Sequence, residues 1–476
     1  MINIGLHGHF YQPPREDPWT GSVLRDPSAE PAHDWNERVC AECYTPNSCA
    51  KLLDADGRIR AVYNNYSKLS FDFGPTLHRW LEGNYPTLNG IIINSGERAM
   101  AQAYNHIIMP LATERDRLTQ TVWGVEDFKY RYGREPKGMW LPECAVDTPT
   151  LETLASCGIE YVILAPSQCR AIVTESGAVE TPGGPNLDVT RPYRCELPSG
   201  RAMTVLFYHA GIARDIAFGG LLDNGDAFKE AMLNAAVEGE DRILITATDG
   251  ESYGHHHKFG EMALARLFEL TDADVRVATP ALDEFLEKHP PEARCVIVEN
   301  SSWSCAHGVE RWRSDCGCHT GGGEGWNQKW RGPMREAFDA LASAVDELYE
   351  TEVSRYGDPW RLRNEAIELY KCGLPLTDEE IREYRKSFFA ERFSGITDAS
   401  ARMLSSLVEM QRMRMFMYTS CAWFFSDVSG VEAQQMLSYA LRAAEIAEEV
   451  SGRKDYIAPL MENLKQAKGN TTRLRS

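Results

Sequence analysis

Residues 243–251 read Ile-Leu-Ile-Thr-Ala-Thr-Asp-Gly-Glu, and this stretch decides the fold of the chain. The run from Ile243 to Thr248 is apolar and rich in β-branched residues, as in a strand that is buried on both faces. Asp249 and Glu251 follow directly, and Gly250 between them permits a tight turn. We therefore expect a buried parallel strand that delivers two carboxylates to its C-terminal end.

Similar short apolar runs alternate with amphipathic helical stretches along residues 1–298. The other strand candidates are Ile2–His7, Gly90–Asn94, Gly138–Leu141, Tyr161–Leu164, Met203–Tyr208 and Val275–Ala278. Repetition of a strand followed by a helix predicts a parallel α/β barrel or a doubly wound sheet. Polar residues directly after strand candidates, at His9, Glu143 and Asp249, favour the barrel, because barrels carry their active sites at these strand ends.

The composition changes after residue 298. A Gly- and Cys-rich segment comes first, and long amphipathic stretches without strand patterns then predict helices packed on one another. We expect a catalytic barrel over residues 1–298, an active-site rim loop over 299–327, an α-helical C-terminal domain over 328–468 and a frayed tail over 469–476.

The chain carries a formal net charge of −19 and has 13 cysteines. A field of this sign repels phosphate backbones and anionic lipids, so nucleic acids and membranes are poor partners, whereas neutral sugar polymers are not excluded. The N-terminus lacks the basic start of a secretory signal, and no apolar run is long enough to span a bilayer. We expect a cytoplasmic protein whose cysteines are mostly reduced. The oligomeric state is not indicated.

Two carboxylates stand at the ends of strand candidates that are far apart in the sequence. Pro142 stiffens the link that aims Glu143, and Asp249 ends the strand described above. Such a pair is the minimal equipment for cleaving a glycosidic bond, with one acid as nucleophile and the other as general acid/base. Glu251 is placed to help raise the pKa of Asp249. Trp140 fits either stacking on a sugar ring or packing in the core.

Each carboxylate also has a purely structural interpretation. Glu143 fits an acidic residue that complements a helix N-terminus, and Asp249 fits a structural acidic turn. The first strand also ends in polar side chains, because His7 and His9 point to one face and Gln12 follows them. These three groups can hydrogen-bond sugar hydroxyls or bind a metal, or they can belong to a turn fixed by two prolines.

Taken together, these motifs resemble those of glycoside hydrolase family 57. The five motifs of that family are matched, in chain order, at His7–Pro13, Tyr104–Pro110, Trp140–Glu143, Thr248–Glu251 and around Ser302–Trp303. The first motif departs from the usual His-Gln-Pro, because this chain has Tyr11 before Gln12 and Pro13.

The resemblance implies an incomplete parallel (β/α)7 barrel followed by a helical domain. It implies a retaining enzyme acting on α-glucans or maltooligosaccharides, as an α-amylase, 4-α-glucanotransferase, branching enzyme or α-galactosidase type. It also implies Glu143 as nucleophile and Asp249 as general acid/base, without a cofactor or catalytic metal. The substrate-binding residues that we expect are His7, His9, Gln12, His106, Trp140, Glu251, His255, Trp303, His307 and Trp423.

Two other functions stay open. A metal-dependent carbohydrate deacetylase would use His7, His9, Asp249 and His255 to hold a metal that activates water. A non-catalytic glucan-binding protein would keep the aromatic surfaces but tolerate the loss of either carboxylate.

The segment 303–319 holds three cysteines and two histidines and is a candidate structural zinc site, although Cys316-Gly317-Cys318 lacks the usual two-residue spacer. Cys40 and Cys43, which have that spacer, form a second candidate together with Cys49. The sequence leaves open whether either group binds a metal.

Overall fold

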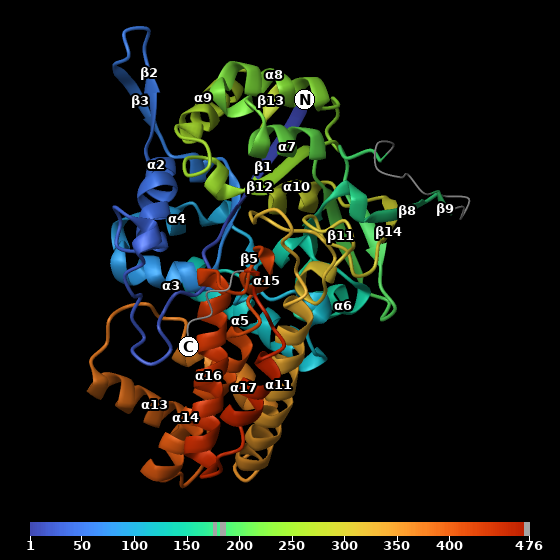
Figure 1. The fold of residues 1–476 in the computed structure, drawn as a ribbon. Coiled ribbons are helices and arrows are strands. Elements are labelled where there is room, and N and C mark those ends of the chain that lie inside the picture. Colours follow the sequence, from blue (N-terminus) through green and yellow to red (C-terminus); the bar gives the residue numbers. More distant parts are fainter. Residues whose placement is uncertain (175–178, 181–186, 471–476) are drawn as a thin grey trace. The chain divides into compact units, whose positions relative to one another are not determined.

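The computed structural model describes residues 1–174, 179–180 and 187–470 and is drawn in Figure 1. Seven parallel strands follow one another around a barrel. In ring order they are β1 (Ile2–Phe10), β4 (Ser70–Phe73), β5 (Ala101–Gln102), β6 (Met139–Trp140), β7 (Tyr161–Leu164), β11 (Ala202–Phe207) and β12 (Leu244–Asp249). Ladder pairing joins β12, β1 and β4, then β5 with β6, and then β7 with β11. This order confirms the predicted parallel α/β barrel.

Single bridges connect these groups of strands. Phe71 bridges to Ala99 just before β5, and Gly138 bridges to Tyr161 at the start of β7. Where β11 meets β12, the backbone N–H of His209 donates to the Ile245 carbonyl oxygen at 2.7 Å. The β5 and β6 strands are short, so this side of the barrel is held by few ladder hydrogen bonds.

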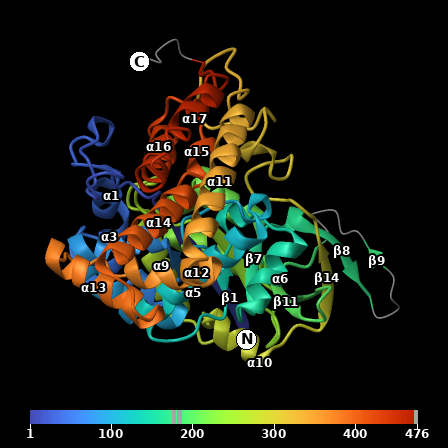
Figure 2. The same cartoon turned by 90° about the horizontal axis from the view of Figure 1, so that it is seen from below.

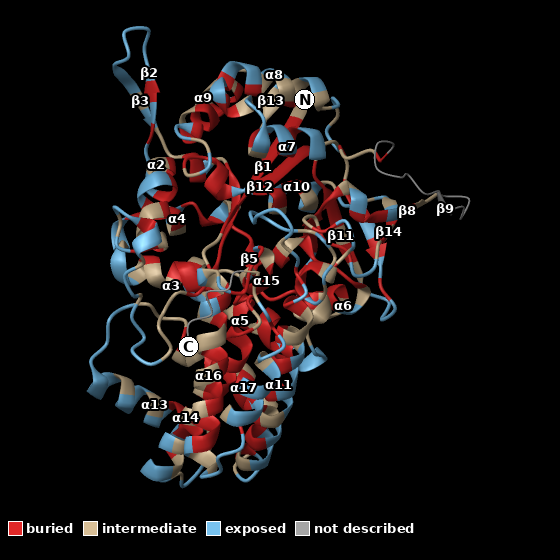
Figure 3. Ribbon diagram, viewed as in Figure 1, coloured by how far each residue is buried: buried red, intermediate tan, exposed pale blue. Residues whose placement is uncertain are grey.

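The central strands are apolar because both of their faces are covered. Residues of β1 from Asn3 onward are buried, and so are all residues of β12 except the last, Asp249 (Figure 3). The β7–β11 pair continues into an outer sheet, and β13 pairs with the start of β1. The added strands are β8 (Cys169–Val173), β9 (Val179–Glu180), β10 (Tyr193–Glu196), β13 (Val277–Ala278) and β14 (Ala293–Ile297). A hairpin of β2 (Ala50–Leu53) and β3 (Ile59–Tyr63) stands apart from the barrel strands.

Helices fill the connections between the strands. They are α1 (Trp35–Val39), α2 (Thr45–Ser48), α3 (Pro75–Asn84), α4 (Pro86–Asn94), α5 (Glu114–Tyr132), α6 (Thr148–Ser156), α7 (Ala210–Phe218), α8 (Gly225–Ala235), α9 (Gly260–Asp272) and α10 (Leu282–Lys288). The strand predicted at Gly90–Asn94 is wrong, because this segment belongs to α4. Pro86 has the φ of a first helical turn, and Leu88 and Ile92 are four residues apart on the buried face.

The chain divides into two compact units. Unit 1 comprises Met1–Gln12, Arg25–Ala103 and Phe128–Trp303, and unit 2 comprises Pro13–Leu24, Tyr104–Asp127 and Ser304–Ser476. Two segments that the sequence analysis placed in the barrel, 13–24 and 104–127, thus group with the C-terminal helices. The predicted boundaries at 298 and 327 stay predictions.

Unit 2 is built mainly of long helices. They are α11 (Arg331–Val353), α12 (Pro359–Glu365), α13 (Asp378–Arg392), α14 (Asp398–Phe416), α15 (Cys421–Phe424), α16 (Val431–Ser451) and α17 (Ile457–Leu464). Helix α14 packs along α16, and α11 packs against both α14 and α17 (Figure 2). None of the helices in the described residues has the length and apolar composition needed to cross a bilayer.

The predicted frayed tail is described only at its first two residues. There the Asn470 amide donates to the Asn327 carbonyl oxygen at 2.8 Å and to an Asp427 oxygen at 3.0 Å. Residues 471–476 lie outside the described part of the chain.

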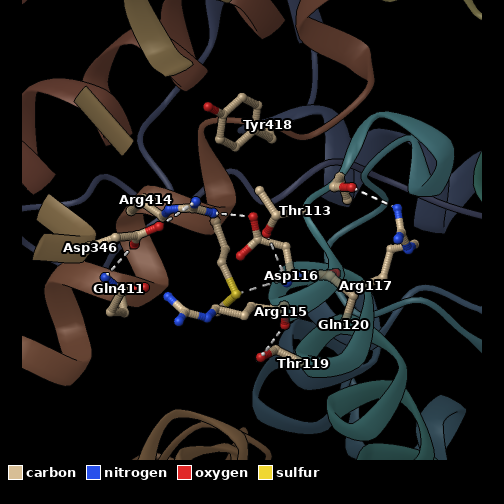
Figure 4. Close-up of polar contacts among 12 residues, drawn as sticks. Thr113, Arg115, Asp116, Arg117, Thr119, Gln120, Asp346, Gln411, Arg414 and Tyr418 are labelled. Atoms are coloured by element: carbon tan, nitrogen blue, oxygen red, sulfur yellow. Dashed lines mark hydrogen bonds and ion pairs between the residues drawn. The ribbon is translucent and has the colours of Figure 1, made fainter. Parts of the chain in front are cut away.

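A buried ion-pair network joins helices α5, α11, α12 and α14 within unit 2 (Figure 4). The Arg414 guanidinium donates to Asp116 at 2.6 Å and to Asp346 at 2.8 Å, and Arg363 pairs with Asp116 at 3.0 Å. Burial alone would raise the pKa of Asp116, but the two guanidinium groups outweigh it and lower that pKa to about 2. Asp116 is therefore ionised at neutral pH, and both arginines depend on its charge.

We expect Asp116→Asn to lower the free energy of unfolding by about 3 kcal/mol, because it leaves two buried guanidinium groups without their common partner. Urea unfolding of the whole chain, followed by circular dichroism, measures this loss. The matched control is Glu336→Gln, since Glu336 is exposed on α11. A loss for Asp116→Asn within about 0.5 kcal/mol of the control would show that the network contributes nothing.

Candidate active site

Three neighbouring strands of unit 1 place polar residues in one row. His9 on β1 is paired in register with Asp72 on β4 and with Asp249 on β12. Paired residues of adjacent strands point to the same face, so these three side chains are neighbours by construction. The row lies at the C-terminal ends of the strands, where barrels carry their active sites.

Asp72 binds both histidines of β1. Its Oδ1 lies 3.0 Å from His7 Nε2, and its Oδ2 lies 2.9 Å from His9 Nδ1. A carboxylate only accepts, so the His7 proton lies on Nε2, and His7 Nδ1 accepts from the Ser70 hydroxyl at 3.0 Å. All four of these side chains are buried.

The two histidines differ in charge. Burial lowers the pKa of His7 and outweighs the stabilising effect of Asp72. Burial also opposes the charged form of His9, but the carboxylates of Asp72, Asp249 and Glu251 outweigh it and raise the pKa of His9 to about 9. His9 is therefore an imidazolium at neutral pH, and it counters the negative charge of the surrounding acids.

Glu143 stands in a turn with an unusual backbone conformation. Its φ is +58°, and that of Cys144 is +49°, in the left-handed region that non-glycine residues rarely occupy. Such a conformation costs about 1–3 kcal/mol per residue and persists only where surrounding contacts hold it. Pro142, at the start of the turn, fixes the direction from which the chain enters.

The segment 301–303 supplies the contacts that hold this turn. The backbone N–H of Trp303 donates to the Glu143 carbonyl oxygen at 3.0 Å, and Ser301 bridges to Val146. Gln168 Nε2 donates to the Cys144 carbonyl oxygen at 2.7 Å. The indole Nε1 of Trp303 donates to Glu143 Oε2 at 3.0 Å. Trp303 thus fixes both the backbone and the carboxylate of Glu143.

Asp249 is the acid whose proton affinity is raised. Burial is the largest cause, His9 opposes it, and the negative charges of Glu143 and Asp72 support it, so the pKa of Asp249 rises to about 6. The side chain keeps access to solvent although protein atoms surround its carboxyl closely. A carboxyl that is accessible and holds its proton to about pH 6 is suited to general acid catalysis.

Glu251 is a second acid with a raised pKa. Burial is again the largest cause, the Tyr44 hydroxyl opposes it and Asp249 supports it, which gives a pKa of about 7. Glu251 Oε1 accepts from the Tyr44 hydroxyl at 2.7 Å and from the backbone N–H of Tyr11 at 3.0 Å. Glu251 therefore links the end of β1 to the turn that follows Asp249.

Four other predicted residues of unit 1 have distinct surroundings. Trp140 is fully buried and stacks on the rings of His7 and His9, with centroids 4.8 and 5.0 Å away. Trp303 meets Trp140 edge-on at 5.1 Å. Gln12 is half-buried directly after β1, and His255 Nδ1 pairs with Glu42. Trp140 and Trp303 therefore join the histidine row to the Glu143 turn.

The remaining predicted residues belong to unit 2. His106 is buried, and its Nδ1 lies 2.6 Å from the Ser420 hydroxyl. Trp423 is fully buried, and its indole donates to the Arg331 carbonyl oxygen at 3.2 Å. His307 is exposed, and its Nδ1 lies 3.5 Å from Cys318 Sγ.

Each of the three histidines that a metal-dependent deacetylase would use as ligands binds a carboxylate in this structure. His7 and His9 bind Asp72, and His255 binds Glu42. Within the described residues, these histidines and Asp249 do not form a group whose ligand atoms converge on one point. The side chains present therefore do not fit the metal site that the deacetylase hypothesis requires.

Two residues of the site were not found from the sequence. Asp72 lies in Ser70–Phe73, a strand too short to stand out, although an acid between two phenylalanines was an available signal. Tyr44, which binds Glu251, ends the π-helical segment Cys40–Tyr44. Such segments are often found at functional sites, but only the folded backbone reveals them.

We expect Asp72→Asn to lower the pKa of His9 by roughly 1–3 units, because the amide removes a buried negative charge and cannot replace its attraction. Histidine-ring NMR titration measures this pKa, and His9→Gln assigns the signal. The matched control is Asp223→Asn, since Asp223 is exposed. An unchanged His9 titration in Asp72→Asn would contradict the charge assignment.

Two family models match this chain. The model described as glycosyl hydrolase family 57 matches residues 18–298, which is more than half of the chain. A second model, described as a domain of unknown function (DUF3536), matches residues 326–476.

Known relatives agree with the first match. An α-amylase from Pyrococcus horikoshii is 24% identical over 252 residues, which are 50% of this chain and 37% of that protein, so the chain spans little more than a third of it. An exo-type maltose-forming amylase from Pyrococcus sp. ST04 superposes with a TM-score of 0.73 at 15% identity, covering 97% of this chain and 82% of the other. A branching enzyme from P. horikoshii gives 0.58 at 15% identity, covering 98% and 94%. The chain belongs to glycosyl hydrolase family 57.

Proposed function

We propose that this protein cleaves or transfers α-glucan chains by retaining double displacement. Glu143 is the nucleophile, and Asp249 is the general acid/base. The observation that carries the proposal is the pair itself: Glu143 is fixed by Trp303, and its charge helps to raise the pKa of Asp249. Two acids in such different surroundings can act as carboxylate and carboxylic acid at the same pH.

In the first step, the Asp249 carboxyl donates its proton to the glycosidic oxygen. The bond between that oxygen and the anomeric carbon breaks, and a Glu143 oxygen attacks the carbon to form a glycosyl ester. The indole N–H of Trp303 donates to Glu143 Oε2 and keeps this oxygen in place while the ester forms. The leaving chain departs with a free hydroxyl.

In the second step, the Asp249 carboxylate takes a proton from an incoming hydroxyl. That oxygen attacks the anomeric carbon, the ester bond breaks, and Glu143 returns to its carboxylate form. Water as the acceptor gives hydrolysis, and a sugar hydroxyl gives chain transfer. The positive charge of His9 beside Asp249 favours its carboxylate form at this stage.

The substrate class rests on the relatives, whose names give amylase and branching activity. Among the predicted binding residues, we propose His9, Gln12, Glu251, His255 and Trp303 as candidates in unit 1. The buried His7 and Trp140 act as positioning residues for this group. His106 and Trp423, which the sequence analysis expected to bind substrate, are equally buried and belong to unit 2, so they are not included in this proposal. A cytoplasmic location stays a prediction.

We expect Asp249→Asn to reduce turnover of maltooligosaccharides by roughly 10²–10⁴-fold. Glu143→Gln should reduce it at least as much, because an amide oxygen cannot replace the carboxylate that forms the glycosyl ester. Product sizing and linkage analysis measure the rates and distinguish hydrolysis, transfer and branching. Glu240→Gln, at an exposed position, is the matched control. Near-normal turnover in either folded variant would remove that residue from its role.

We expect kcat/KM for maltooligosaccharides to fall by about tenfold per pH unit above roughly pH 6, because the general acid must carry a proton and Asp249 loses it there. An aryl maltooligosaccharide has a leaving group that needs no proton. The Asp249→Asn variant should therefore still cleave this substrate, and its kcat/KM should not fall above about pH 6. A wild-type profile that stays flat to about pH 8 would contradict Asp249 as the acid.

A further inference from the structure

Four metal-ligating side chains converge in unit 2, in the loop that precedes α11. They are Cys305, His307, Cys316 and Cys318, and their ligand atoms all lie within 4.8 Å of one another. Cys305 Sγ lies 3.9 Å from Cys316 Sγ, and Cys318 Sγ lies 3.5 Å from His307 Nδ1. Within the described residues, this group alone brings three or more such ligand atoms together.

These separations match the edges of a tetrahedron around zinc. Bonds of about 2.3 Å from zinc to sulfur and about 2.0–2.1 Å from zinc to nitrogen give tetrahedral edges of about 3.8 Å between two sulfurs and about 3.5 Å between sulfur and nitrogen. The Cys305–Cys316 and Cys318–His307 separations of 3.9 and 3.5 Å already match these edges, and the other pairs, all within 4.8 Å, need to close by at most about 1.3 Å. A disulfide between Cys305 and Cys316 would require their sulfur atoms to approach to about 2.05 Å.

The backbone explains how the short Cys316–Cys318 spacing delivers both sulfurs to one point. Gly317 has a φ of +84°, and a side chain there would meet nothing within 4 Å. This left-handed conformation turns the chain between the two cysteines, and glycine adopts it without strain. Gly308, directly after His307, has a φ of +80° and turns the other half of the loop. The unusual spacer is therefore compatible with convergent ligands.

A buried cation beside the cluster indicates that the cluster is anionic when occupied. Arg331 on α11 is fully buried, and its Nη1 donates to the Cys318 carbonyl oxygen at 2.8 Å. No carboxylate of the described residues forms an ion pair with Arg331. The Arg331 Nη2 also donates to the Phe425 carbonyl oxygen at 3.3 Å, and an anionic cluster would balance the guanidinium charge that these neutral acceptors leave uncompensated. Three thiolates and a neutral imidazole on a divalent ion leave one net negative charge at this place.

We propose that Cys305, His307, Cys316 and Cys318 bind one structural zinc ion. Thiolate and imidazole ligands suit zinc, and four protein ligands close the coordination sphere, so the ion holds the loop and has no open position for a substrate. The ion connects the two ends of segment 305–318 and, through the bond from Arg331 to Cys318, anchors them to α11. This role replaces the sugar-binding role predicted for His307.

The test is the metal content of the purified full-length chain. Elemental analysis should find about one zinc per chain. Exchange with Co²⁺ should give the intense visible bands of tetrahedral thiolate ligation. Cys318→Ser and Cys316→Ser, which alter half-buried positions, should each lower the zinc content at least several-fold. Cys49→Ser, at an exposed cysteine outside the cluster, should retain it.

The same measurements can overturn the proposal. A wild-type chain without zinc after growth with zinc and without chelator contradicts it, as does a Cys305–Cys316 disulfide found by peptide mapping. Undiminished zinc in Cys318→Ser and Cys316→Ser excludes this ligand set. If both variants fail to fold, the wild-type metal content and the Co²⁺ spectrum decide. Glu143 and Asp249 take no part in this site, so loss of their activity would not affect the result.

Discussion

The candidate active site depends on the buried ion pair between His9 and Asp72. The register of β4, β1 and β12 places these residues and Asp249 in one row, so their charges act on one another directly. Asp72 keeps His9 protonated, and the imidazolium offsets part of the repulsion among the acids nearby. Without this cation, the two carboxyl groups of the row and the nearby Glu251 would have no positive charge beside them in the row.

The two proposed catalytic acids owe their difference to their surroundings. Glu143 is held outside the row by a left-handed turn, and Trp303 donates to it through both backbone and indole. Asp249 ends a buried strand, where surrounding protein atoms and neighbouring negative charges raise its pKa. Trp140 packs between these two parts by stacking on the histidines and meeting Trp303 edge-on. Trp140 thus contacts both the histidines of the row and the Trp303 side chain that holds Glu143.

Much of this architecture could be predicted from the sequence, for physical reasons that also explain the failures. Strands such as β7 and β12 are apolar on both faces, so their composition identifies them, and the end of β12 also identifies Asp249. The helix at Pro86–Asn94 was mistaken for a strand because its three consecutive isoleucines are β-branched, whereas the proline at its start decides the outcome. Asp72 was not predicted because its contacts with His7 and His9 arise only when β4 pairs with β1, and local sequence does not show that pairing. Likewise, neither the positive φ of Glu143 nor the convergence of Cys305 with Cys318 is encoded in local composition.

The central claim is that Glu143 forms a covalent bond to the sugar. Incubating the wild-type chain with a 5-fluoro-α-glycosyl fluoride, which slows the second step, and mapping the labelled peptides by mass spectrometry tests this directly. The account predicts one glycosyl ester, located on Glu143. A label on Asp249 or Asp72, or turnover of this reagent with inversion at the anomeric carbon and no labelled peptide, would contradict it.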